Sequence, residues 1–209
     1  VSSTSLILDH ADFLLSSGQR QEAEQVLSNG TTLTLAKTTD TKNVRIWLRW
    51  AELSSQVESP STTPANILRR ALKYTPLHDR YAHTLILTEL MQYLMNTKPS
   101  TSKSNEELKL LFQKLILLSQ GSNYSISKVK RSDDNEAEDE GEEMVNIAST
   151  FVAYLKHSIL DDDDPDGARL IYTSVLYHSN YGKSCSGKTR DELLSMKSFF
   201  DLCIQYEKT

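Results

Sequence analysis

The sequence V-R-I-W-L-R-W-A-E-L-S, residues 44–54, decides how the rest of the chain is interpreted. Trp47 and Trp50 are the only two tryptophans, and a spacing of three residues places them on one side of a helix. Val44 and Ile46 lie on different sides of this helix, so its apolar residues occupy more than one face. A helix that is apolar over so wide an arc needs more than one neighbour to cover it. Stacked helical repeats provide this burial, because each helix packs on its partner and on the next repeat.

The composition favours an all-α fold of antiparallel helix pairs stacked as a superhelical solenoid. The chain has 209 residues, of which 38% are hydrophobic, and only seven glycines and five prolines interrupt it. Few segments alternate as β-strands do, so helices are expected throughout. Cys185 and Cys203 are not spaced as metal ligands, which is typical of a reduced intracellular protein. No apolar run approaches the roughly 18 residues that a membrane span requires.

Negative charge is concentrated in one segment. Residues 132–143 contain eight acids and no basic residue, and the formal net charge of the whole chain is −5. Without these eight acids the chain would carry +3, which is less basic than a dedicated nucleic-acid binder. A block of like charges without apolar residues does not fold, so residues 120–140 are expected to form a disordered acidic insertion. Ser132 resembles an acidophilic kinase site, and a solvated segment without a function is the alternative.

Helical periodicity and capping signals predict nine helices. Their expected ranges are 3–17, 19–28, 42–56, 64–74, 80–95, 105–118, 142–157, 165–177 and 190–207. Gly18 and the pair Asn29-Gly30 are interpreted as the ends of the first two helices, and Pro64 as the first residue of the fourth. Connections are expected at residues 31–40, 97–104 and 179–189.

The chain also contains an internal repeat. With Trp47 as reference, the corresponding residues are Ile7, Tyr81, Phe151 and Phe200, at intervals of 40, 34, 70 and 49. The longest interval includes the acidic insertion. Residues 168–176 likewise align with residues 64–72, the second helix of the pair. Periods in this range are typical of helix-turn-helix solenoids.

Three motifs, W-L-R-W-A-E-L at 47–53, A-R-L-I-Y at 168–172 and F-D-L-C-I-Q-Y-E at 200–207, resemble half-a-TPR (HAT) repeats. In that family the first helix carries Trp-x-x-Tyr with a downstream Glu, and the second carries Ala-Arg-x-x-Tyr. The resemblance covers nearly the whole chain as one domain, 1–209, of about four and a half repeats, and it is weak between residues 81 and 118. Its signature residues, expected to be structural, are Trp47, Trp50, Glu52, Leu53, Ala168, Arg169, Tyr172, Tyr206 and Glu207.

The resemblance implies a function. HAT proteins are non-enzymatic scaffolds of RNA-processing assemblies in the nucleus, and they bind other protein subunits. The C-terminal motifs are most similar to the branch of the family that matures pre-ribosomal RNA in the nucleolar small-subunit processome. Subunits of mRNA 3′-end cleavage or splicing complexes, and a TPR module that binds peptide tails, are alternatives, and direct RNA contact is left open. The chain is expected to be part of a longer protein.

The signature also predicts local packing. Trp47 and Trp50 are expected to fill the seam between adjacent helices, and Tyr172 the equivalent gap from a second helix. A buried Glu52 would need a donor, for which Arg69 is a candidate. No cofactor, metal or catalytic residue is expected, because the five histidines are scattered without acids or cysteines at suitable spacing.

Two other motifs suggest ligands. Residues 182–189, G-K-S-C-S-G-K-T, match the phosphate loop G-x-x-x-x-G-K-[ST]. Such a loop needs a buried parallel strand before it, whereas residues 169–177 have helical periodicity, so a P-loop nucleotide-binding protein is the less favoured class. The acids Asp162, Asp164 and Asp166 match the start of a calcium loop, but Thr173 occupies the position that requires Glu. Helix capping by these acids is the preferred interpretation.

Overall fold

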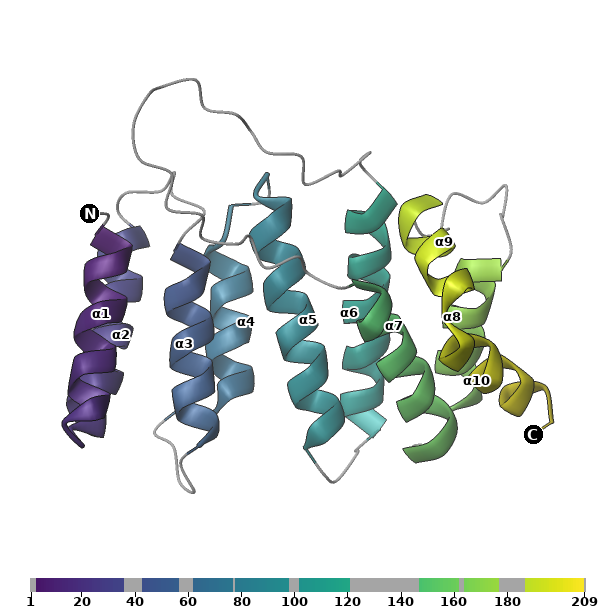
Figure 1. The fold of residues 1–209 in the computed structure, drawn as a ribbon, viewed down its shortest axis with the longest axis horizontal. Helices are drawn as coiled ribbons and strands as arrows, with labels where there is room; N and C mark the ends of the chain where they lie inside the picture. The colour runs from purple at the N-terminus through teal and green to yellow at the C-terminus, as the bar shows by residue number, and fades with distance from the viewer. Residues whose placement is uncertain are drawn as a thin grey trace. The chain divides into compact units, whose positions relative to one another are not determined.

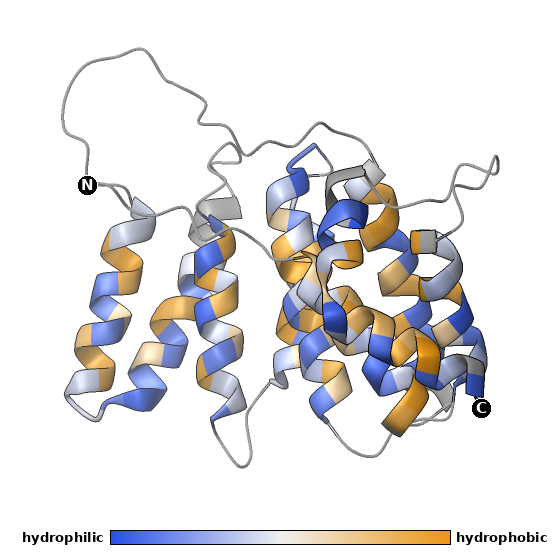
Figure 2. Ribbon diagram, turned by 45° about the vertical axis from the view of Figure 1, so that its right-hand side comes forward, coloured by the Kyte–Doolittle hydropathy of each residue, from blue (hydrophilic) through white to orange (hydrophobic). Residues whose placement is uncertain are grey.

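A computed structural model of the chain describes residues 3–35, 43–56, 62–76, 78–97, 102–120, 147–161, 164–176 and 187–208 (Figure 1). All regular secondary structure in these ranges is helical, so the all-α prediction is confirmed for them. The elements are α1 (Ser3–Ser16), α2 (Arg20–Leu35), α3 (Asn43–Ser55), α4 (Pro64–Tyr74), α5 (Arg80–Asn96), α6 (Ser102–Gln120), α7 (Ile147–Lys156), the π-helix η1 (His157–Asp161), α8 (Pro165–Leu176), α9 (Gly187–Ser195) and α10 (Lys197–Lys208). Hydrophobic and hydrophilic residues alternate in bands along these helices, as expected of amphipathic helices (Figure 2). None of the described helices is long and apolar enough to cross a membrane.

The chain divides into two compact units, Val1–Leu111 and Phe112–Thr209. The single domain expected from the sequence stays a prediction. In the first unit each helix from α1 to α4 packs against the next one, and α3 also packs against α1 and α5. In the second unit α7 packs against η1, α8, α9 and α10. The helix α3, which carries both tryptophans, therefore has neighbours on several sides.

Capping residues fix several boundaries as the sequence predicts. Helix α1 ends in a Schellman motif, in which Gly18 has φ +76° and Gln19 N donates to Leu14 O at 2.8 Å. Helix α4 keeps its predicted bounds, because Pro64 occupies its start and Thr63 Oγ1 accepts from Asn66 N at 3.4 Å. These signals are local, which is why the sequence alone locates them.

The predicted end of the second helix at Asn29-Gly30 is wrong. Helix α2 continues to Leu35, so residues 31–35 are helical and only residues 36–40 of the expected connection fall outside the described part. Gly30 is buried, and a Cβ built on it would lie 2.7 Å from Ile7 Cγ2. The glycine is thus needed for close packing of α1 on α2 rather than for a turn.

Smaller differences concern the later helices. Helix α6 begins at Ser102, inside the expected linker, and α9 begins at Gly187, inside the expected loop at 179–189. The single last helix predicted for 190–207 is divided at Met196, whose N–H donates to Leu193 O at 3.0 Å. The π-helix follows α7 where the sequence predicts the end of a helix. Residues 121–146, with Ser132 and nearly all of the acidic insertion, lie outside the described residues.

The core of the second unit is aromatic. The Phe112 ring lies 4.5 Å from the Phe151 ring and 5.1 Å from the Tyr154 ring, and all three side chains are buried. Asp164 caps α8, since its Oδ1 accepts from Gly167 N at 3.2 Å. The capping interpretation therefore holds for Asp164, whereas Asp162 lies outside the described part.

Replacing Gly30 by alanine is expected to lower the free energy of unfolding by about 1–2 kcal/mol. The new methyl group would overlap Ile7, and this overlap outweighs the roughly 1 kcal/mol by which alanine favours a helix over glycine. Urea denaturation followed by circular dichroism measures the change.

A control variant removes the side chain of Ile7 that the new methyl group would overlap. In an Ile7→Ala background, which lacks the overlapping methyl groups, Gly30→Ala is expected to stabilise the protein. Equal stabilisation in the wild-type and Ile7→Ala backgrounds would show that α1 and α2 do not approach closely at Gly30.

Candidate protein-interaction surface

Trp47 and Trp50 form the centre of an aromatic cluster on α3. Both side chains are buried, and their rings are stacked with centroids 5.9 Å apart and an interplanar angle of 29°. Trp50 Nε1 donates to Glu24 Oε1 of α2 at 3.4 Å. The indoles are therefore held by packing on one side and by a weak polar contact on the other.

Helix α4 covers these indoles. The Tyr74 ring stacks on Trp47 at 6.3 Å with an interplanar angle of 14°. The guanidinium carbon of Arg70 lies 5.7 Å from the Trp50 ring centroid and 6.0 Å from that of Trp47, both within the range of cation–π attraction. Lys73 Nζ lies 5.7 Å from the Tyr74 ring centroid. Arg70, Lys73 and Tyr74 are exposed, and we call these three residues the α4 patch.

The arginine next to this patch has its charge compensated. Arg69 forms a bidentate ion pair with Glu107 of α6, with Nε–Oε1 and Nη2–Oε2 distances of 2.7 Å. Its hydrogen bonding to the Glu107 carboxylate raises the pKa of Arg69 above its ordinary value. Neither Arg70 nor Lys73 forms an ion pair with any residue that the structure describes.

The expectation of a buried Glu52 bonded to Arg69 is wrong. Glu52 is exposed, and its carboxylate accepts from Arg49 Nη1 at 2.6 Å. Arg49 also donates from Nη2 to Asp12 Oδ1 at 2.7 Å, so one guanidinium joins α3 to α1. These hydrogen bonds, with that of Glu52 the larger cause, raise the pKa of Arg49. Glu52 lies on the solvent side of α3, because Trp50 and Leu53 take the positions that face the neighbouring helices.

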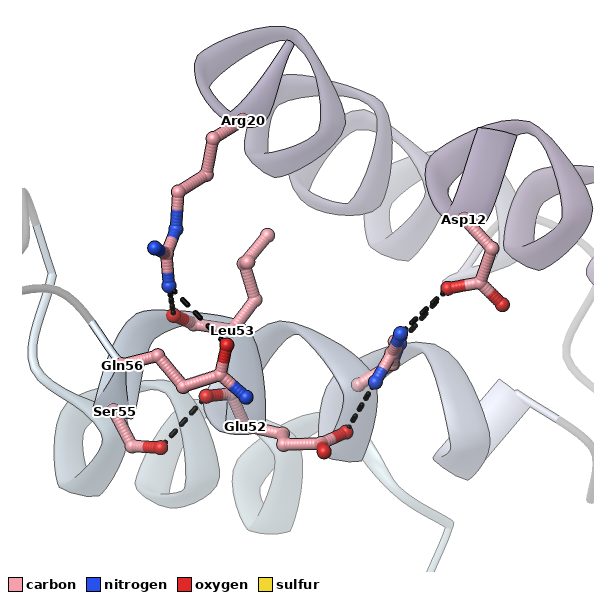
Figure 3. Close-up of polar contacts among 7 residues, drawn as sticks. Asp12, Arg20, Glu52, Leu53, Ser55 and Gln56 are labelled. Carbon is pink, nitrogen blue, oxygen red and sulfur yellow. Dashed lines mark hydrogen bonds and ion pairs between the residues drawn. The ribbon is translucent and has the colours of Figure 1, made fainter. Parts of the chain in front are cut away.

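A second polar contact joins α2 to the end of α3. Arg20 Nη2 donates to Leu53 O at 3.2 Å and to Gln56 Oε1 at 3.3 Å. Figure 3 shows both contacts, with Arg20 and Asp12 reaching α3 from two different helices. Leu53 itself is buried. No local sequence signal predicts these contacts, because they depend on tertiary packing.

The C-terminal signature residues lie on α8 and α10. Ala168 is buried, Arg169 is exposed and Tyr172 is half-buried. The Tyr172 ring lies 5.9 Å from the Tyr206 ring at an interplanar angle of 41°. The side chain of Glu207 is outside the described part. The assignment of the signature residues to a repeat family stays a prediction.

Some apolar side chains face solvent in both units. Phe13 of α1 is 65% exposed, whereas its neighbour Leu14 is buried. Phe200 and Ile204 are exposed on α10. The buried stripe of α1 is therefore narrower than its run of apolar residues suggests.

The ligand motifs receive no support from the described ranges. In the phosphate-loop motif, Gly187, Lys188 and Thr189 begin α9, and residues 182–186 are outside the described part. The described parts include no strand that could precede such a loop. They also contain no group of three side chains suited to a metal ion.

The described part of the chain is thus all-helical, and it carries an exposed cationic and aromatic patch on α4. Comparison with family models, with curated proteins and with solved structures finds no match.

Substitutions in α3 are expected to separate buried from exposed signature residues. Trp47→Ala should lower the free energy of unfolding by about 3–5 kcal/mol, because it removes a large buried ring. Glu52→Ala should lower it by no more than about 1 kcal/mol, because its ion pair is exposed to solvent. Urea denaturation of the two variants and the wild type, followed by circular dichroism, measures both. A loss at Glu52 as large as that at Trp47 would contradict the exposed position of this carboxylate.

Proposed function

We propose that this protein is a non-enzymatic scaffold subunit that holds partner proteins in a ribonucleoprotein complex for pre-ribosomal RNA processing. The observation that carries the proposal is the position of the repeated aromatic motifs. Trp47, Trp50 and Phe151 are buried among helices, as residues that maintain a stack would be, and such a stack would leave its outer surfaces for partners.

The proposal includes a solenoid of antiparallel helix pairs. Contacts between consecutive helices α1 to α5, together with those of α3 with α1 and α5, are what a stack of helix pairs requires. Such stacks bind partner proteins as helices or extended peptides along their surfaces.

The complex is proposed from the sequence motifs. They resemble HAT repeats, and most of all the HAT protein of the U-three small nucleolar RNP, a part of the small-subunit processome. The protein is accordingly placed in the nucleolus and needs no cofactor. A HAT subunit of an mRNA 3′-end cleavage or splicing complex is the alternative within the same family.

Affinity purification from nuclear extract tests the complex. A tagged protein is expected to retain small-subunit processome proteins, identified by mass spectrometry, and to retain them after ribonuclease treatment because the contacts are between proteins. Enrichment of cleavage or splicing factors in their place would select the alternative complex. Absence of any RNA-processing subunit would contradict the proposal.

Nucleotide titration tests the other class of protein. Isothermal calorimetry with ATP and Mg²⁺ is expected to give no heat above dilution, because a phosphate loop depends on a preceding strand. Binding that is lost in Lys188→Ala but retained in Lys183→Ala would instead establish residues 182–189 as a nucleotide site.

A further inference from the structure

We propose that the α4 patch binds an acidic segment of a partner protein, with carboxylates at Arg70 and Lys73 and an apolar or aromatic side chain against Tyr74. The inference rests on the proposed scaffold function, because it names the chemistry of one partner. It is argued from the placement of these three side chains and from the charges around them.

The patch is compact. Arg70, Lys73 and Tyr74 follow each other at i, i+3 and i+4 of one helix, so they lie on the same face within about one turn. All three are exposed. A short segment with two acids and one apolar residue can therefore contact the three side chains at once.

Arg70 is already ordered for binding. Its guanidinium lies over the two buried indoles, at 5.7 and 6.0 Å from their centroids. A guanidinium stacked on rings keeps its N–H edge free for two parallel bonds to a carboxylate. Part of the side-chain entropy that binding normally costs is thus already lost in the free protein.

The charge of the patch is not used within the described fold. Arg49 and Arg69 have carboxylate partners at 2.6–2.7 Å. The charged groups of Arg70 and Lys73 instead lie near aromatic rings and form no ion pair with a described residue. Helix α4 itself, P-A-N-I-L-R-R-A-L-K-Y, contains no acid. An acidic partner supplies the missing negative charge.

A protein segment is favoured over RNA by the number of charges. Nucleic-acid binders typically neutralise several phosphates along a backbone, whereas the patch offers only two cations within one helical turn, neither paired with an acid that the structure describes. Two carboxylates of a peptide match this small site better.

The test uses the full chain and a fluorescein-labelled peptide of repeated Glu-Glu-Leu units. Binding is expected to raise the fluorescence anisotropy of the peptide and to change the emission of Trp47 and Trp50, the only tryptophans, which lie under Arg70. The same peptide with Gln in place of Glu should not bind. The affinity should fall with added salt, because the contacts are exposed to solvent.

Three variants locate the binding site. Arg70→Gln/Lys73→Gln is expected to weaken binding about tenfold or more. Lys114→Gln/Lys197→Gln removes the same charge from exposed positions on α6 and α10 and should leave the affinity within about twofold. Lys73→Glu leaves Arg70 over the indoles, so it keeps the fold if the double variant does not, and it should also weaken binding about tenfold or more.

Several outcomes would overturn the inference. The first is that the wild type does not bind the acidic peptide. The second is that the control variant Lys114→Gln/Lys197→Gln loses as much affinity as Arg70→Gln/Lys73→Gln. The third is that a labelled oligouridine binds more tightly than the peptide and that the patch variants lose this binding. Failure here with normal retention of processome proteins would leave the proposed function intact. If the peptide binds as expected but no RNA-processing partner is retained, the proposed function is contradicted and the inference about the α4 patch still holds.

Discussion

The first unit depends on the burial of two indole rings in α3. Trp47 and Trp50 are too large to be covered by one helix, so Glu24 of α2 contacts one edge and α4 supplies Arg70 and Tyr74 on the other side. Burying a tryptophan removes a large apolar area from water, and this favours whichever arrangement brings α2, α3 and α4 together. The aromatic pair thereby determines both the local packing and the chemistry of the surface above it.

Charged side chains play two different roles around this core. Arg49 joins α1 to α3 through Asp12, and Arg69 joins α4 to α6 through Glu107. Each of these solvent-exposed pairs contributes roughly 0.2–1 kcal/mol, so they orient helices more than they stabilise them. Arg70 instead covers aromatic rings and keeps its charge available. The distinction between the two roles is visible only when the partner of each arginine is known.

Local signals in the sequence predict much of the fold. Pro64 with Thr63, and Gly18, give the start of α4 and the end of α1, because these caps depend only on neighbouring residues. Asn29-Gly30 misleads, since contact with Ile7 favours a continuous helix over the local turn signal. The position of Glu52 could not be predicted, because its exposure depends on which sides of α3 are covered. The α4 patch could have been predicted, because two basic residues and a tyrosine lie on one face of the expected helix. It was missed because the repeat motifs do not contain these three residues.

The sequence segment that aligns with α4 shows that a cation at the position of Arg70 is not part of the shared pattern. In the alignment of residues 64–72 with 168–176, Arg69 and Arg70 correspond to Thr173 and Ser174. Ser174 is buried and its hydroxyl donates to Ile171 O at 2.8 Å within its own helix, so α8 is built without a cation there. Arg70 is thus not part of what the two aligned helices share. An exposed cation that the shared pattern does not require is expected of a surface that recognises a particular partner.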